Sequence, residues 1–384
     1  MTRLKYWLPG LLLSTAMLPA AAATLNTPDH VVIVVEENQL ADAILGSPNA
    51  NYINSLAASG MSYTNAHGTD HDSQPNYLEL FSGANPGVQG VVSPLQQTYP
   101  AGLNIETPTD PTVIAGLNNS DNPNKIPFST PNLAAGLHAA GKTFAGYSED
   151  LPGVGSTVNK APGSQGLRSY VQKHNPWVQW QGVGPNQLAA SVNQPLTTFT
   201  GIGDYATLPT VSFVIPGESH DMHDVVSKDG LYAVDPVTHA ITSPYATGFD
   251  IHGNPVNADT SIQAGDNWLK SNLEGYRQWA MTHNSLLITL WDENDYSNGA
   301  NNIAMIVNGP TNLVQVGENN NYVNHFDLLK TLEHTYGAPE TGFAATAAGL
   351  SVNAAGALSV PEPMALGLLA SGIAGLAGIR RRRA

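Results

Sequence analysis

The amino-acid sequence predicts an α/β fold in three layers, with a mostly parallel central sheet covered by helices on both faces. Apolar, β-branched runs of strand length alternate along the chain with segments whose apolar residues recur at helical spacing, which is typical of such a sheet. Charged and polar clusters follow directly after several of these runs. Ligand sites in parallel sheets form at the carboxyl ends of the strands, so the clusters indicate where a site would lie.

The chain up to residue 215 supplies four predicted strands and one predicted helix. Residues 30–35 are a continuous β-branched run, as expected for a strand buried on both faces. Residues 62–66 are a shorter strand candidate. Thr130 and Pro131 are the predicted N-cap and first-turn proline of a helix that places Leu133 and Leu137 on one face. Two more strands are expected at 143–147 and 210–215.

The second half continues the alternation. From Asp266 onward, apolar residues follow helical spacing, and buried strands are predicted at 285–290 and 303–307. A closing helix is expected over 325–336. Two stretches interrupt the pattern, 100–128 rich in Pro and Asn and 228–262 rich in Gly, Pro and Thr. Both are interpreted as loop insertions around the site.

The two ends of the chain carry targeting features. Arg3 and Lys5 precede a short apolar run and three alanines, so residues 1–23 are predicted to be a signal peptide, with an uncleaved anchor as the alternative. The predicted catalytic domain covers 24–338 and a linker covers 339–359. Residues 360–384 contain Pro-Glu-Pro, a short apolar stretch and four arginines, and resemble the PEP-CTERM sorting signal of Gram-negative bacteria. That resemblance implies export to the periplasm, envelope or exterior and recognition by an exosortase-type enzyme at the membrane. The alternative is an ordinary tail anchor.

Composition narrows the range of functions. Hydrophobic residues make up 42% of the 384 residues, as in globular proteins, and there is no cysteine. A metal would therefore be held by oxygen and nitrogen ligands. The formal net charge is −15, although several basic residues lie in the terminal segments. Such an acidic domain repels phosphate backbones, which argues against nucleic acid as a partner.

Five polar constellations are candidates for chemistry. Glu36, Glu37 and Asn38 end the first strand, where carboxylates can bind a cation, or they form a solvated turn. Ser73 precedes a predicted helix, which suits a nucleophile facing backbone N–H groups but also a simple N-cap. The other three constellations are 220–224, with two histidines and two aspartates, 291–295, with Asp292 and Glu293 after a strand, and His325 at a helix start. A polar surface loop is the alternative for 220–224, and a helix cap or a packed residue is the alternative for His325.

The order of these constellations resembles the alkaline phosphatase superfamily and, more closely, the phosphoesterase family that includes bacterial phospholipases C and acid phosphatases. The resemblance covers about residues 29–337. It is carried by segments 30–38, 52–56, 73–77 with Ser82 and Gly83, 146–150, 173–176, 221–224, 265–269, 291–293 and His325. It implies an alkaline-phosphatase-like three-layer α/β/α sandwich.

The resemblance also implies roles for single residues. Ser73 is the implied nucleophile, attacking phosphorus to give a phosphoserine that water hydrolyses. The implied metal ligands are Glu37, Asn38, Asp292 and Glu293. His223 and His325 are candidates for protonating the leaving group, and Lys173, His174, His220 and Asp221 for contacting the substrate.

The sequence departs from the family at three places that matter. Asp72 stands where proline is common, and Gln39 stands where a histidine or arginine is frequent. The Asp292–Glu293 pair replaces the Asp-His pair of two-zinc relatives. The expected metal is therefore a divalent cation, and its identity among Mg²⁺, Ca²⁺, Mn²⁺ and Zn²⁺ is left open. The oxygen ligands favour a hard ion. The expected substrate is a phosphate ester, and the first expectation is an activity like that of an acid phosphatase. The alternatives are a phospholipase C acting on diesters and a non-catalytic envelope or matrix protein on the same fold.

Overall fold

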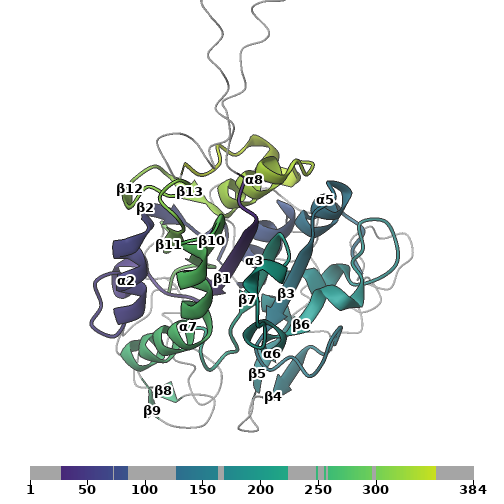
Figure 1. Cartoon of the computed structure of the whole chain (residues 1–384). Coiled ribbons are helices and arrows are strands. Elements are labelled where there is room, and N and C mark those ends of the chain that lie inside the picture. The colour runs from purple at the N-terminus through teal and green to yellow at the C-terminus, as the bar shows by residue number, and fades with distance from the viewer. Residues whose placement is uncertain are drawn as a thin grey trace, which may run out of the picture.

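The computed structural model describes residues 27–71, 73–84, 127–162, 168–223, 248–249, 255–256, 258–295 and 300–351. Its main element is a nine-stranded sheet, shown in Figure 1. The strands are β1 (His30–Glu36), β2 (Met61–His67), β3 (Phe144–Ser148), β6 (Asn193–Pro195), β7 (Val211–Ile215), β10 (Ser285–Trp291), β11 (Asn302–Asn308), β12 (Gly317–Asn319) and β13 (Val323–Asn324). Their order is β12-β2-β11-β10-β1-β7-β3-β6, with β13 paired to β2.

The sheet is mostly parallel, as the sequence predicts. β1 lies at its centre and pairs in parallel with β10 on one side and β7 on the other. Among the described strands of this sheet, only β11 runs antiparallel to both of its neighbours, β10 and β2. The five valine and isoleucine side chains of β1 are at most 1% exposed, which is why this strand is an unbroken apolar run.

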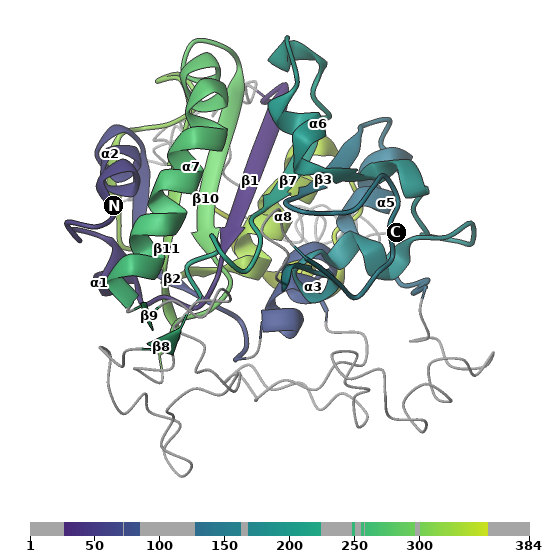
Figure 2. The same cartoon turned by 90° about the horizontal axis from the view of Figure 1, so that it is seen from below.

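Helices cover both faces of this sheet (Figures 1 and 2). α3 (Ser73–Ser82), α5 (Leu133–Ala139) and α8 (His325–Tyr336) pack on one another. α2 (Asn51–Ser59) packs on α7 (Ala258–Ala280), which in turn contacts β10. The three-layer α/β sandwich predicted from the sequence is therefore confirmed. The smaller elements are α1 (Ala41–Ile44), α6 (Leu196–Thr200), the hairpins β4 (Lys160–Pro162) with β5 (Arg168–Val171) and β8 (Gly248–Phe249) with β9 (Pro255–Val256), and 3₁₀ turns at 172–174, 176–180, 190–192, 205–207 and 342–346.

Two predicted helix starts were wrong. α5 is capped by Asn132, whose side chain accepts the N–H of Ala135, so the cap lies two residues after the predicted Thr130. Asparagine is at least as good a cap as threonine, and here it outcompetes the Thr-Pro signal. α7 begins at Ala258, well before Asp266, and part of the predicted loop insertion 228–262 is helical.

The segment that follows α8 packs against that helix. We call residues 338–351 the C-terminal strap. The carboxylate of Asp327 accepts the N–H groups of Ala348 and Gly349, both at 2.9 Å. Glu333 accepts the N–H of Thr341 at 3.0 Å and its hydroxyl at 2.6 Å. The first part of the predicted linker 339–359 is therefore held on the domain, and the rest lies outside the described residues.

The strap also crosses the end of α3 at Gly83. The N–H of Phe343 donates to the carbonyl of Gly83 at 2.8 Å. Gly83 has a φ of +67°, and a Cβ there would collide with the carbonyl oxygen of Thr341. We expect Gly83→Ala to lower the free energy of unfolding by about 2–4 kcal/mol, because backbone strain and a backbone clash add. Urea unfolding of the two proteins measures this difference.

Gly141→Ala is the matched control for this prediction. Gly141 has a similar φ of +71°, but no atom lies within 4 Å of its added Cβ. It should therefore show only the strain of a left-handed residue, about 1–2 kcal/mol. Equal losses in the two variants would show that the crossing of the strap over Gly83 is not tightly packed.

No helix of the described residues is long and apolar enough to span a membrane. The predicted signal peptide 1–23 and sorting tail 360–384 lie outside the described residues.

Candidate active site

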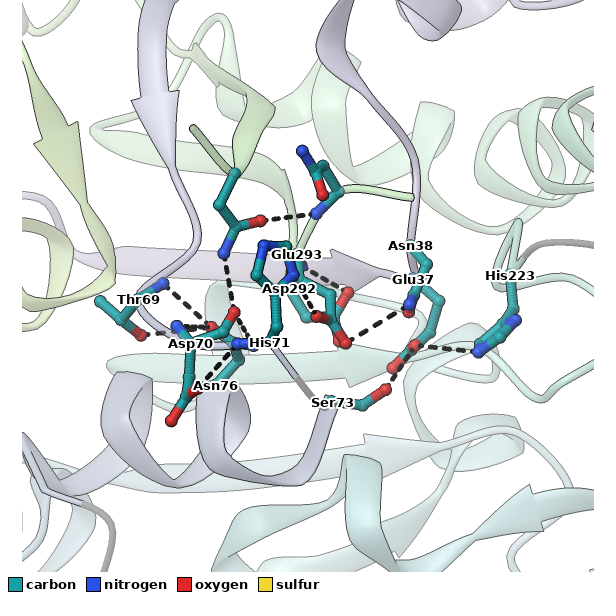
Figure 3. Close-up of polar contacts among 12 residues, drawn as sticks. Glu37, Asn38, Thr69, Asp70, His71, Ser73, Asn76, His223, Asp292 and Glu293 are labelled. Atoms are coloured by element: carbon teal, nitrogen blue, oxygen red, sulfur yellow. Dashed lines mark hydrogen bonds and ion pairs between the residues drawn. The ribbon is translucent and has the colours of Figure 1, made fainter. Parts of the chain in front are cut away.

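Polar side chains from distant parts of the chain converge at the carboxyl ends of β1 and β10, beside the first turn of α3 (Figure 3). Glu37 and Asn38 directly follow β1, Asp292 and Glu293 directly follow β10, and Ser73 is the first residue of α3. The structure thus brings together the predicted nucleophile and all four predicted metal ligands. Parallel pairing of β1 with β10 explains this, because parallel strands end at the same edge of a sheet.

Ser73 is held by a carboxylate. Its Oγ donates a 2.9 Å hydrogen bond to Oε2 of Glu37, and the residue is 5% exposed. The other oxygen of Glu37, Oε1, lies 3.0 Å from Nε2 of His174 in an ion pair. The ring of His174 stacks on Tyr77 of α3, with centroids 5.1 Å apart. Glu37 therefore connects the serine to a fixed imidazole.

A second group lies beside the first. Nδ2 of Asn38 donates to Oε1 of Glu293 at 3.3 Å. The other oxygen of Glu293 lies 3.0 Å from Nδ1 of His71. His71 precedes Ser73 by two residues and its side chain is 19% exposed, so the imidazole held by Glu293 is in part accessible.

The oxygen atoms of this site fit a hard divalent cation. Oδ1 of Asn38 and Oδ2 of Asp292 are buried without a hydrogen-bond partner, and burying such acceptors unpaired is costly. Carboxylate and amide oxygens are the ligands that Mg²⁺, Ca²⁺ and Mn²⁺ prefer. Within the described ranges, no three His, Asp or Glu side chains by themselves form a metal site. The fit therefore depends on a mixed set in which the amide oxygen of Asn38 completes the carboxylates.

Burial shapes the charges of the site. It raises the pKa of the Asp292 carboxyl well above its ordinary value, and the neighbouring Glu37 and Glu293 raise it further. Burial alone would also raise the pKa of Glu37, but His174, His223 and Lys173 outweigh it and hold this pKa below its ordinary value. A bound cation would remove the repulsion among these carboxylates.

The segment after β7 supplies further groups. The carbonyl of Asp221 accepts the N–H of Glu37 at 2.7 Å, and its Oδ2 lies 3.9 Å from Nδ1 of His174. Burial and the charge of Glu37 raise the pKa of Asp221. Nε2 of His223 lies 3.9 Å from Oε2 of Glu37, the oxygen that holds Ser73. His223 is 18% exposed at its side chain, so its imidazole is accessible at the site.

His220 and Lys173 lie less centrally. Nδ1 of His220 pairs with the carboxylate of Glu149, which follows β3, at 3.0 Å, and its side chain is 38% exposed. Lys173 follows Gln172 in a 3₁₀ turn, and its charge favours the ionised forms of Glu37 and Asp221. Both residues remain predictions as substrate contacts.

His325 is placed differently from the other predicted residues. It is 0% exposed, and its ring nitrogens lie 3.3 Å from Oγ1 of Thr69 and 3.1 Å from the carbonyl oxygen of Trp291. Burial lowers the pKa of His325 to about 4. A neutral imidazole enclosed in this way is poorly suited to protonate a leaving group.

Sequence reasoning assigned no role to His71, to Glu149 or to the turn from Thr69 to Asn76. His71 stood inside the segment that marked the nucleophile, and that position was the available signal. Glu149 was quoted only as part of a family segment. Asp72 and Asp224, two acidic residues beside the site in sequence, lie outside the described residues.

Comparison with known proteins gives consistent matches. The sequence model of the Phosphoesterase family matches residues 48–247, a range that includes Ser73 and ends before Asp292. The chain is 36% identical over 327 residues to a phosphatidylinositol-3-phosphatase of Mycobacterium tuberculosis, covering 85% of this chain and 83% of that protein. It is 23% identical over 294 residues to a phosphate-repressible acid phosphatase of Penicillium chrysogenum, covering 76% of this chain and 55% of the fungal protein. A solved structure of a protein in the alkaline phosphatase superfamily from Vibrio parahaemolyticus superposes with a TM-score of 0.47 at 13% identity, covering 85% of this chain and 71% of that one.

Proposed function

The chain belongs to the phosphoesterase family, and we propose that it is a metal-dependent phosphatase that works through a phosphoserine on Ser73. As a member of this family it is a hydrolase acting on phosphoric ester bonds. The observation that carries the finer proposal is the bond from Ser73 Oγ to Glu37 Oε2, inside a group of buried carboxylates with unpaired oxygens. A serine held this way at a helix start is suited to in-line attack on phosphorus.

Glu37, Asn38, Asp292 and Glu293 are the residues that would hold the metal, next to Ser73. When bound, the metal supplies positive charge that lowers the pKa of the serine hydroxyl and neutralises charge on the phosphoryl oxygens. Glu37 orients the serine Oγ through its hydrogen bond, and His174 in turn fixes Glu37. Ser73 is the first residue of α3, so the N-terminal N–H groups of this helix would lie near a phosphoryl group attacked by the serine.

His223 is the residue we assign to proton donation. Its Nε2 lies 3.9 Å from the oxygen of Glu37 that accepts the Ser73 hydroxyl, and its side chain is in part exposed. The enclosed His325 lacks such access. His223 would protonate the leaving alkoxide when the phosphoserine forms and would accept a proton from the attacking water when it is hydrolysed.

The substrate that we favour is a phosphate monoester, carried on an inositol-lipid head group. Both curated relatives described above are named phosphatases, and the one that matches along most of its length is named for a phosphoinositide. Diester hydrolysis of the phospholipase C kind is the second candidate. Export, the sorting tail and its exosortase-type partner stay predictions from the sequence.

Hydrolysis assays on the full chain test the proposal. The protein would be treated with a chelator to remove metal and then supplied with Mg²⁺, Ca²⁺, Mn²⁺ or Zn²⁺ in turn. The substrates would be two monoesters, para-nitrophenyl phosphate and a short-chain phosphatidylinositol 3-phosphate, and one diester, para-nitrophenyl phosphorylcholine. We expect metal-restored release of phosphate from the two monoesters and little turnover of the diester. Preferential cleavage of the diester would instead support the second candidate, a phospholipase C. If the folded protein cleaves none of the three substrates with any of the metals, the proposed enzymatic activity is refuted.

A further inference from the structure

Asn76 fixes the turn that leads into α3, the helix that begins with Ser73. Its Oδ1 accepts the N–H groups of Thr69 at 3.0 Å and of Asp70 at 2.9 Å, and its Nδ2 donates to the carbonyl of Asp70 at 2.9 Å. Asn76 is 0% exposed. Since Ser73 lies between Asp70 and Asn76 in the chain, this turn determines where the serine stands. Figure 3 shows Thr69, Asp70 and Asn76 beside the carboxylates.

The hydroxyl of Thr69 connects this turn to His325. Oγ1 of Thr69 lies 3.2 Å from Oδ1 of Asn76 and 3.3 Å from Nδ1 of His325. On the other side of the ring, Nε2 of His325 lies 3.1 Å from the carbonyl oxygen of Trp291. Trp291 is the last residue of β10 and directly precedes Asp292. A continuous path of buried contacts thus joins the serine turn to the end of the strand that supplies the metal ligands.

The hydrogen on the ring of His325 can be placed. A carbonyl only accepts, so Nε2 of His325 carries the hydrogen that Trp291 receives. The low pKa of about 4 keeps the ring neutral near pH 7, which leaves Nδ1 as an acceptor. Oγ1 of Thr69 donates to Oδ1 of Asn76 and lies 3.3 Å from Nδ1 of His325, so one hydroxyl contacts both side chains. Thr69 is 2% exposed and His325 is 0% exposed, so neither side chain has an exposed face to offer a substrate.

We propose that Thr69 and His325 form a positioning pair that fixes the separation between Ser73 and the carboxylates at the end of β10. This inference rests on the proposed function. In this inference His325 has a positioning role, which differs from the proton donation expected from the sequence. Catalysis by a serine beside a metal site depends on short distances, and misplacement by about 1 Å lowers turnover by up to about 10²-fold.

Thr69→Val tests the pair, because valine keeps the shape of threonine and lacks its hydroxyl. We expect kcat for para-nitrophenyl phosphate to fall by about 10- to 100-fold while KM stays within about twofold, since the substrate contacts are retained. Thr69→Ser restores the hydroxyl and is expected to recover most of the lost kcat. If Thr69→Val does not fold, His325→Gln is the second variant, since its amide can still donate toward Trp291 while the contact with Thr69 is lost.

Thr331→Val is the matched control. Thr331 lies on α8 and is 2% exposed, as Thr69 is, and its hydroxyl binds the carbonyl of Asp327 and the N–H of Leu350 in the C-terminal strap. It should lower the melting temperature and leave kcat unchanged. An unchanged kcat in Thr69→Val, equal losses of kcat in the two variants, or no recovery in Thr69→Ser would each overturn the inference. Absence of turnover in the wild type would instead reject the proposed function itself, and the pair with it.

Discussion

Ser73→Ala is expected to lower kcat for para-nitrophenyl phosphate by at least about 10³-fold, with the protein still folded and still binding metal. The hydroxyl is the group that attacks phosphorus, and alanine leaves no atom in its place. Glu37 would lose only one hydrogen bond and keep its ion pair with His174. In the wild type, acid quenching during turnover followed by mass spectrometry should find phosphate on the peptide that contains Ser73, and the alanine variant should show none.

Ser82→Ala is the control for this result. Ser82 is the last residue of the same helix and is 3% exposed, and its Oγ donates locally to the carbonyls of Leu78 and Ala84, both at 2.8 Å. Its removal perturbs α3 without touching the site, so activity should be kept. Should Ser73→Ala retain more than about a tenth of wild-type kcat, direct attack by water or a different nucleophile would have to be assumed.

Asp292→Asn is expected to lower activity without lowering the stability of the metal-free protein. Asp292 is crowded by Glu37 and Glu293, and its unpaired Oδ2 is one of the atoms that would hold a metal. We expect kcat to fall by about 10²-fold or more and the metal-induced rise in melting temperature to disappear. In the metal-free protein the variant should be at least as stable as the wild type, because one buried acid group is removed from the cluster.

The sign of the pH dependence follows from the raised pKa of Asp292. The folded metal-free protein keeps a proton on this carboxyl that the unfolded chain has already lost, so folding stability decreases as the pH rises above the ordinary value of 3.8. Asparagine does not titrate, so the advantage of the metal-free variant should grow between pH 4 and neutral pH. Thermal unfolding across pH, with and without metal, measures both effects.

Asp266→Asn is the comparison variant. Asp266 is also a buried carboxylate, 5% exposed, but both of its oxygens accept N–H groups of α2, from Tyr52 at 3.0 Å and Ile53 at 2.8 Å. Its replacement should lower the melting temperature and leave the metal response intact. If Asp292→Asn instead destabilises the metal-free protein and keeps its response to metal, the oxygen cluster around Glu37 is not the cation site.

The sequence predicted the parts of this protein whose signal is local and strong. β1, β7 and β10 are mostly apolar and buried, and each was predicted to within one residue at either end. Glu37, Ser73 and Asp292 were candidates because each stands directly at the end of a strand or the start of a helix, and the family resemblance supplied their expected roles. Pairing of parallel strands then brings such positions together without further information.

What could not be predicted depends on contacts between distant residues. The enclosed position of His325 depends on Thr69 and on the carbonyl of Trp291, and no spacing in the sequence reports either. The strap looked like a linker because it is rich in Ala, Gly and Thr, yet its backbone N–H groups are held by Asp327 and Glu333 from α8. His71 was passed over because a single histidine beside a loop has no distinctive pattern.

The central place of β1 bears on when the protein acquires its activity during synthesis. β1 is the first of the described strands to be made, but it pairs over its full length with β10, and Asn38 bonds Glu293, which lies 255 residues further along the chain. Contacts of such long range form slowly and only after both partners exist. A chain interrupted before residue 292 lacks two of the four residues proposed to hold the metal, so we expect such truncated forms to be inactive. In the proposed phosphatase, hydrolysis would begin only after β10 and the two residues that follow it have been made.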